Sequence, residues 1–319
     1  MKTLDELKRF YHQQLKPDLR ILEEQRLVLV KKITIIGVIA FGAAGLFILI
    51  FGFKASDPVP FIIFPLMIAG GSTFGLGWFI SKGYRSEFKR AIIERLVNFV
   101  DSQLKYNPTG HVRQSEFNAS KIFNTKPNRY KGDDLVWGKI GQTTIKFSEL
   151  DAKYESGSGK NRSVKTIFKG LFFIADFNKH FSGQTVVLPD TAERLFGRLG
   201  QMLQEWNFSR DDVVKLEDPE FEREFAVYSS DQVEARYILS TSLMKRICDF
   251  KRKSGKKIHL SFIGSLVNVA ISYNRSLFEP RLFSTLLDFE PVMEYFEDLS
   301  LAVGLVEDLN LNMRIWTKV

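Results

Sequence analysis

The segment DPEFEREFAVYSSD, residues 218–231, places carboxylates among aromatic side chains. A carboxyl group in such a setting can act as a general acid or base, so Glu222 and Glu224 are the candidate catalytic residues. No nucleophile or metal ligand accompanies them in the sequence. The alternative is structural: a strand over 222–229 puts both residues at the start of one face, and Asp231 then caps a helix. We favour the structural interpretation, which leaves no assigned catalytic residue.

Two other patterns that could do chemistry are incomplete. The loop SGSGK at 156–160 resembles a phosphate-binding loop, but Tyr154 and Asn161 occupy the places where that motif requires glycine and serine or threonine. The single Cys248 allows no internal disulfide and points to a reducing compartment. The histidines stand far apart in the sequence, so we expect no metal site and no cofactor. They are His12, His111, His180 and His259.

Two uncharged segments dominate the first quarter of the chain. Residues 33–53 and 59–80 contain 21 and 22 residues without a charge. As helices they would each be roughly 31–33 Å long, close to the hydrocarbon thickness of a bilayer. The first is longer than the apolar core of a signal peptide and has no small-x-small cleavage site. Both segments are therefore predicted to be transmembrane helices.

The turn at 54–58 is too short for anything but a hairpin, so both flanks must lie on the same side of the membrane. Basic residues concentrate on these flanks, with Arg20 and Arg26 further back, and the positive-inside rule places the flanks and both termini in the cytoplasm. Residues 1–110 hold 15 basic and 9 acidic residues, so +6 of the net charge of +8 lies beside the membrane. This distribution favours anionic lipids as a partner over nucleic acid. The residues expected to contact lipid head groups are Lys31, Lys32, Lys82, Arg85, Lys89 and Arg90.

The second apolar segment contains Gly71 and Gly75 at the spacing that lets two helix backbones approach closely. We expect these glycines to pack within the hairpin, and dimerisation of two copies is the alternative. Neither apolar segment contains an ionisable residue, and two helices cannot enclose a polar path. A channel or transporter is therefore disfavoured.

Hydrophobic periodicity predicts an α+β cytoplasmic region with antiparallel or mixed sheets after the transmembrane hairpin. Residues 1–32 form a juxtamembrane helix interrupted at Pro17, and an amphipathic helix runs from Ser86 to Tyr106 within a connecting segment 81–110. A first strand-rich part then covers 111–190 and a second α+β part covers 191–319. Expected strands are 134–140, 143–154, 163–178, 185–188, 213–216, 222–229, 257–263, 266–273 and 312–317, and expected helices are 191–205, 232–253 with a break near Ser240, and 290–310.

Three blocks of sequence carry a resemblance to a known family. They are GDDLVWGKIG at 132–141, FKGLFFIADFN at 168–178 and LEDPEFEREFAVYSSDQVEARYILSTSLMKRI at 216–247. With the preceding apolar hairpin, they make the chain similar to the bacterial domain-of-unknown-function 3137 family. The resemblance implies an inner-membrane setting and carries over no catalytic residue, because the family has no assigned activity.

The preferred interpretation is an interaction or adaptor protein, without enzymatic activity, that is anchored in the inner membrane by two passes and binds a protein partner. One alternative is a membrane-associated enzyme that acts on lipid or cell-envelope substrates through acids that only the fold assembles. A second alternative is a sensor of a ligand or of the lipid surface. Self-association into a homo-oligomer is compatible with all three.

Overall fold

The computed structural model describes residues 2–54, 57–189, 213–309 and 311, and divides into two compact units. The hairpin unit consists of Lys2–Arg95 together with Phe278–Glu294. The sheet unit consists of Leu96–Leu277 and the chain from Tyr295 onwards. The predicted helix 191–205 and strand 312–317 lie outside the described residues.

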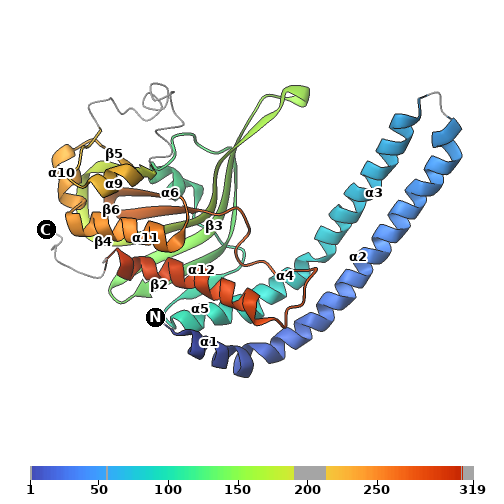
Figure 1. The fold of residues 1–319 in the computed structure, drawn as a ribbon, viewed down its shortest axis with the longest axis horizontal. Helices are drawn as coiled ribbons and strands as arrows, with labels where there is room; N and C mark the ends of the chain where they lie inside the picture. Colours follow the sequence, from blue (N-terminus) through green and yellow to red (C-terminus); the bar gives the residue numbers. More distant parts are fainter. Residues whose placement is uncertain (1, 55–56, 190–212, 310, 312–319) are drawn as a thin grey trace. The chain divides into compact units, whose positions relative to one another are not determined.

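The hairpin unit is built from long helices (Figure 1). Pro17 does not interrupt the helix as predicted, because it lies in the first turn of α2, where its missing N–H group costs nothing, directly after a π-helical turn. The predicted amphipathic helix ends at Val100 instead of Tyr106. The elements are α1 (Leu4–Phe10), the π-turn η1 (Tyr11–Leu15), α2 (Lys16–Phe51), the short 3-10 helix η2 (Gly52–Lys54), α3 (Pro58–Ile80), α4 (Lys82–Phe88) and the π-turn η3 (Lys89–Ile93). They are followed by α5 (Glu94–Val100), which continues into the sheet unit.

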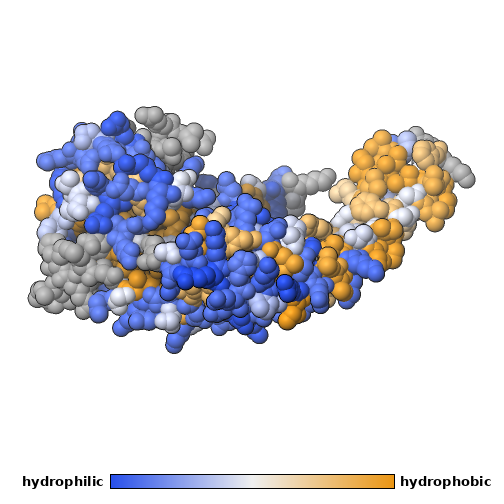
Figure 2. Space-filling model, turned by 60° about the horizontal axis from the view of Figure 1, so that its bottom comes forward, coloured by the Kyte–Doolittle hydropathy of each residue, from blue (hydrophilic) through white to orange (hydrophobic). Residues whose placement is uncertain are grey.

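Two of these helices are long and apolar enough to cross a membrane, as predicted. The first belongs to the continuous helical stretch Leu4–Phe51, and the second is Pro58–Ile80. Asp57 caps the second helix by accepting a hydrogen bond from the Val59 N–H group. In Figure 2, hydrophobic residues cover the end of this hairpin, whereas hydrophilic residues predominate over the rest of the visible surface.

The sheet unit contains an antiparallel six-stranded sheet, which confirms the α+β class. The strand order is β1-β2-β3-β4-β5, and β6 pairs with β4. Gly141 adopts φ 58° in the short turn between Arg129–Ile140 and Thr143–Ser156. The strands are β1 (Lys105–Asn107), β2 (Arg129–Ile140), β3 (Thr143–Ser156), β4 (Ser163–Pro189), β5 (Phe225–Ser229) and β6 (Ile258–Ser272).

Some strands are longer than their sequence patterns predicted. The expected strands 163–178 and 185–188 are one strand, β4, and 257–263 and 266–273 are likewise one strand, β6, which bends where Gly264 adopts φ 62°. Because β4 pairs with β3 in its first half and with β5 in its second, the boundary at residue 190 does not divide the sheet. Residues from both predicted parts share one sheet.

Capping side chains begin several helices of the sheet unit, as predicted for Asp231. Ser240 ends the preceding turn and caps the next helix, which confirms the predicted break. Asp218 and Asp231 are both N-caps that accept backbone hydrogen bonds. The strand predicted at 222–229 is wrong in its first part, because Pro219 at the first helical turn makes Pro219–Glu224 a helix. The helices are α6 (Gln114–Ala119), α9 (Pro219–Glu224), α10 (Gln232–Ile238), α11 (Thr241–Ser254) and α12 (Phe289–Asp308), of which the last begins in the hairpin unit.

Close backbone contact between β4 and β6 fixes one position as glycine. Gly170 has φ 147°, and a Cβ atom there would lie 2.1 Å from the carbonyl oxygen of Ile271. We expect Gly170→Ala to lower the free energy of unfolding by more than about 4 kcal/mol, measured by denaturant unfolding of the full chain in detergent.

Gly255→Ala is the matched control for this substitution. Gly255 also has positive φ, at 61°, but a Cβ atom there would meet nothing within 4 Å. Gly255→Ala should therefore lower the free energy of unfolding by only about 1–2 kcal/mol, the cost of the strained backbone dihedral angle. Equal losses for the two variants would contradict the steric argument.

Candidate functional site

The two apolar helices pack through small side chains other than those predicted. Gly77 lies against Ile33 and Gly37 against Thr73, and Ala44 and Ala69 are buried. At the predicted packing residues Gly71 and Gly75, an added Cβ atom would meet nothing within 4 Å. Their side of α3 is therefore not the side that packs on α2 among the described residues.

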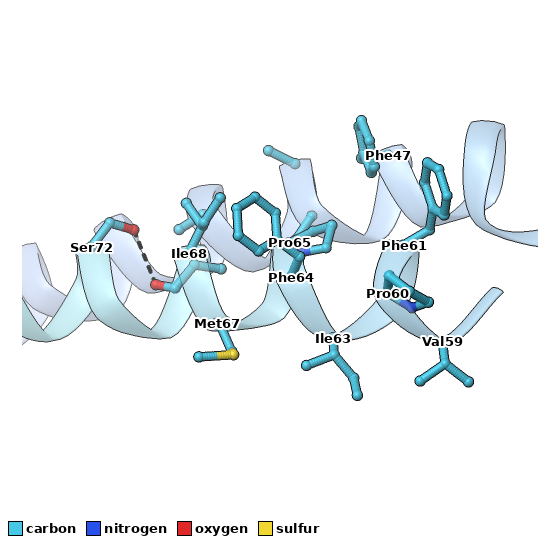
Figure 3. A pocket seen from close by; sticks show the side chains of 14 residues that line it. Phe47, Val59, Pro60, Phe61, Ile63, Phe64, Pro65, Met67, Ile68 and Ser72 are labelled. Atoms are coloured by element: carbon cyan, nitrogen blue, oxygen red, sulfur yellow. Dashed lines mark hydrogen bonds between the residues drawn. The ribbon is translucent and has the colours of Figure 1, made fainter. Parts of the chain in front are cut away.

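A groove of about 910 Å³ runs along the hairpin and is almost wholly apolar. Figure 3 shows its lining side chains from α3 together with Phe47 from α2, and the one polar side chain, Ser72, donates its hydroxyl to the Ala69 carbonyl at 3.1 Å. Since Ser72 satisfies itself within the helix, the groove offers no polar group to orient a ligand. It fits a surface that faces lipid chains.

The basic residues beside the spans divide into exposed and paired groups. Lys31, Lys32, Lys82 and Arg90 are exposed, as contact with lipid head groups requires. Lys89 is instead buried, with 4% of its surface exposed, and its Nζ lies 2.8 Å from the Glu279 carboxylate. Lys89 is thus held inside the protein, and we leave it out of the proposed lipid contact.

Arg85 occupies an intermediate position between these groups. Its guanidinium lies 5.8 Å from the ring centroid of Trp78, near the end of α3. It also donates to the Ser81 hydroxyl at 2.7 Å, and its Nε is 4.0 Å from a Glu279 oxygen. Arg85 therefore connects the end of the second apolar helix with residue 279.

Residues 278–287, which we term the strap, are fastened to α2 by a buried ion pair. Arg26 is only 8% exposed, and it donates at 2.9 and 2.7 Å to the Glu23 carboxylate. Its third hydrogen bond goes to the Leu282 carbonyl at 2.8 Å. Glu23 in turn accepts the Leu286 N–H at 3.0 Å. The pair thus holds the strap by one backbone donor and one backbone acceptor.

The ion pair with Arg26 shifts the pKa of the Glu23 carboxyl. The hydrogen bonds from the Arg26 guanidinium lower the pKa of the Glu23 carboxyl from 4.5 to about 2, against the opposing effect of burial. A shift of this size corresponds to roughly 3 kcal/mol at neutral pH. Because the folded-state pKa is the lower one, this stabilisation is complete above about pH 4.5 and is lost as the pH falls towards 2.

We expect Glu23→Gln to release the strap, because it leaves a buried guanidinium without its counter-charge. Amide hydrogen exchange at Leu286, measured on the full chain in detergent, should accelerate on the order of 100-fold at neutral pH. Glu24→Gln is the control, since Glu24 is the exposed neighbour on the same helix. Unchanged exchange in Glu23→Gln would show that the ion pair does not hold the strap.

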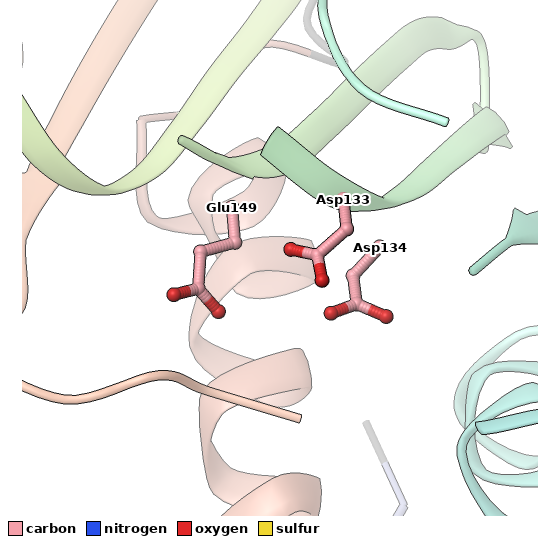
Figure 4. Close-up of side chains that lie close together, drawn as sticks. All are labelled: Asp133, Asp134 and Glu149. Atoms are coloured by element: carbon pink, nitrogen blue, oxygen red, sulfur yellow. The ribbon is translucent and has the colours of Figure 1, made fainter. Parts of the chain in front are cut away.

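In the sheet unit, three carboxylates converge between β2 and β3. Asp133, Asp134 and Glu149 have oxygen atoms within 4.8 Å of one another, and Figure 4 shows the three side chains turned to the same side. Asp134 is fully buried with φ 57°, at a bulge in the β2–β3 register. Carboxylate oxygens are the ligands that Ca²⁺ and Mg²⁺ prefer.

Two hydrogen bonds connect this cluster to neighbouring parts of the sheet unit. The Tyr106 hydroxyl donates to Asp134, and the Leu277 N–H donates to Glu149 at 2.8 Å. The carboxylates thereby join β1, β2 and β3 to the residue at which the chain leaves the sheet unit. The cluster was not predicted from the sequence, although the Asp-Asp pair facing Glu149 across a predicted hairpin was a usable signal.

A groove of about 540 Å³ lies on one face of the sheet beside α6. Trp137, Lys146 and Ile174 are paired in register across β2, β3 and β4, so their side chains share this face. Further along the same face, Phe117 of α6 packs with Phe172. The groove is therefore the part of the face next to the helix.

Polar and apolar groups meet at the rim of this groove. Trp137 is 37% exposed and Leu266 is 42% exposed. Lys146 pairs with Glu116 of α6, and Arg113, just before α6, is exposed. The groove thus combines an indole, an aliphatic wall and charged groups of both signs.

The candidate catalytic acids lie elsewhere. Glu222 accepts the Leu216 N–H at 2.8 Å, and Glu224 pairs with Lys251, which lowers the pKa of the Glu224 carboxyl. Neither residue lines the groove beside α6. Both have structural partners, in line with the favoured interpretation of this segment.

The fold thus defines a class of protein: an antiparallel α+β sheet unit joined to an apolar two-helix hairpin. Residues 166–311 match the model of the family described as "Protein of unknown function (DUF3137)", which confirms the family indicated by the sequence blocks. The matched part begins within β4 and extends past α12.

Two further comparisons add little. No curated protein sequence matches the chain. The crystal structure of the mycobacterial trehalose monomycolate transport factor A, TtfA, is similar over 68% of this chain and 96% of that chain, with 9% identity and a TM-score of 0.33. A similarity this distant carries no statement about function.

Proposed function

We propose that this protein is anchored in the bacterial inner membrane by the α2–α3 hairpin and that its sheet unit is a cytoplasmic module that binds a protein partner. Two long apolar helices support the anchor. The basic flanks support the cytoplasmic placement. The resemblance to the bacterial family supports the inner-membrane setting.

The groove beside α6 is the observation that carries the binding role. Trp137 and Arg113 are exposed at its rim, and tryptophan and arginine are among the residues that dominate binding energy at protein interfaces. The groove volume of about 540 Å³ would accommodate a few side chains of a partner. We favour binding over catalysis because Glu222 and Glu224 lie outside this groove.

Membrane topology is tested with single cysteines in a Cys248→Ser background. We expect Lys54→Cys, in the turn between the spans, to react with a membrane-impermeant thiol reagent in spheroplasts. Lys82→Cys, at the other end of α3, should react only after the membrane is opened. Labelling of Lys82→Cys in intact spheroplasts, or activity of a periplasmic reporter fused after Val319, would contradict the placement.

Binding at the groove is tested by in-cell crosslinking from two matched positions. A photoreactive phenylalanine at Trp137 should give a defined crosslinked product, and the same group at Tyr154, an exposed aromatic residue of β3, should not. Arg113→Glu should reduce the Trp137 product more than about tenfold, the effect of losing an interface hot spot. Identical products from both positions would show that the groove is not the binding site.

A further inference from the structure

The strap, residues 278–287, lies in the same unit as the hairpin. It is held by one residue of α2 and by one residue that follows α4. Lys89, which follows α4, holds it at Glu279 with a 2.8 Å ion pair. Arg26 of α2 holds it at the Leu282 carbonyl with a 2.8 Å hydrogen bond. The strap is therefore a defined part of the hairpin base.

The level of the strap along the hairpin can be estimated from these contacts. Ile33 is the first residue of the uncharged segment 33–53. Arg26 precedes it by seven positions, which is roughly 10 Å along a helix. Arg85, which approaches Glu279, follows the last residue of α3 by five positions. The head-group layer adds about 5–8 Å to each side of the hydrocarbon core. The strap thus lies at the outer edge of that layer.

An aromatic contact marks the same level. Trp78 is exposed near the end of the second span, and tryptophan is enriched at membrane–water interfaces. Arg85 lies 5.8 Å from the Trp78 ring centroid and 4.0 Å from Glu279, so one side chain spans the distance between the interface marker and the strap.

Phe283 is the most exposed large apolar side chain of the described residues, at 80%. It directly follows Leu282, whose carbonyl Arg26 fixes. Leu27 and Val28, the next residues of α2, are also more than half exposed. Moving an exposed aromatic ring out of water is favourable, and the bilayer interface is the less polar medium, enriched in aromatic side chains, that the hairpin itself brings near.

We propose that the strap is a third membrane contact, with Phe283 inserted into the head-group layer of an anionic bilayer. Exposed Lys31, Lys32 and Lys82 would bind the surrounding head groups. This inference rests on the proposed membrane anchor. Because the strap leads into α12, it gives the chain entering the sheet unit an attachment that depends on the lipid surface.

The test places a fluorophore beside Phe283 without replacing it. Ser284→Cys, an exposed strap residue, is labelled with an environment-sensitive dye in the Cys248→Ser background, and the full chain is reconstituted into vesicles of phosphatidylcholine and phosphatidylglycerol. Lipids with a spin label near the head group should remove most of its fluorescence. The additional substitution Phe283→Asp should abolish this quenching.

Two further labels separate the possible outcomes. Phe47→Cys, within the first span, reports on the anchor, and Leu4→Cys, at the exposed start of α1, should stay unquenched. Quenching at 47 but not at 284 would overturn the strap contact and leave the anchor intact. Absence of quenching at both would overturn the anchor itself. Protection of 284 from both lipid-borne and water-soluble quenchers would assign the strap to a protein partner and overturn the proposal.

Discussion

Strand β4 imposes the main constraint on the sheet unit, because the backbone groups of 27 consecutive residues need hydrogen-bond partners on both edges. No single neighbour supplies them. β3 pairs with the first half, β5 with the last residues, and β6 with most of the opposite edge. β4 therefore draws strands from both sides of residue 190 into one sheet. The position of β3 then determines where the carboxylate cluster and the groove beside α6 can form.

The base of the hairpin unit depends on buried charges. Taking a charge out of water is costly, and both Arg26 and Lys89 are buried with a carboxylate partner close by. Each pair also fixes the strap, so the same contacts that satisfy the charges define the path of the chain. The lysines nearer to the spans remain exposed, and no protein group among the described residues needs to neutralise them. They are the charges that we propose to bind anionic lipid.

Two of the exposed apolar surfaces among the described residues differ in character. The hairpin is apolar over whole helical turns and has almost no polar lining in its groove, which suits a solvent of lipid chains. The groove beside α6 sets Trp137 and Leu266 among charged side chains of both signs. Mixed surfaces of this type can be exposed to water and still bind a protein, because the polar rim keeps them hydrated until a partner arrives.

The sequence by itself determined the two apolar helices, the α+β class, the N-cap Asp231 and the resemblance to the family whose model matches residues 166–311. These features depend on local periodicity, on capping side chains or on a long uncharged run, all of which can be read from neighbouring residues. Only the tertiary structure decided that 219–224 is helical, that Gly71 and Gly75 face away from α2, and that Arg26 is buried. Only the tertiary structure shows that Asp133 and Asp134 lie beside Glu149 and that Trp137 lies opposite Lys146. These arrangements depend on strand register and on contacts between residues distant in the chain, and hydrophobic patterns do not encode such distances.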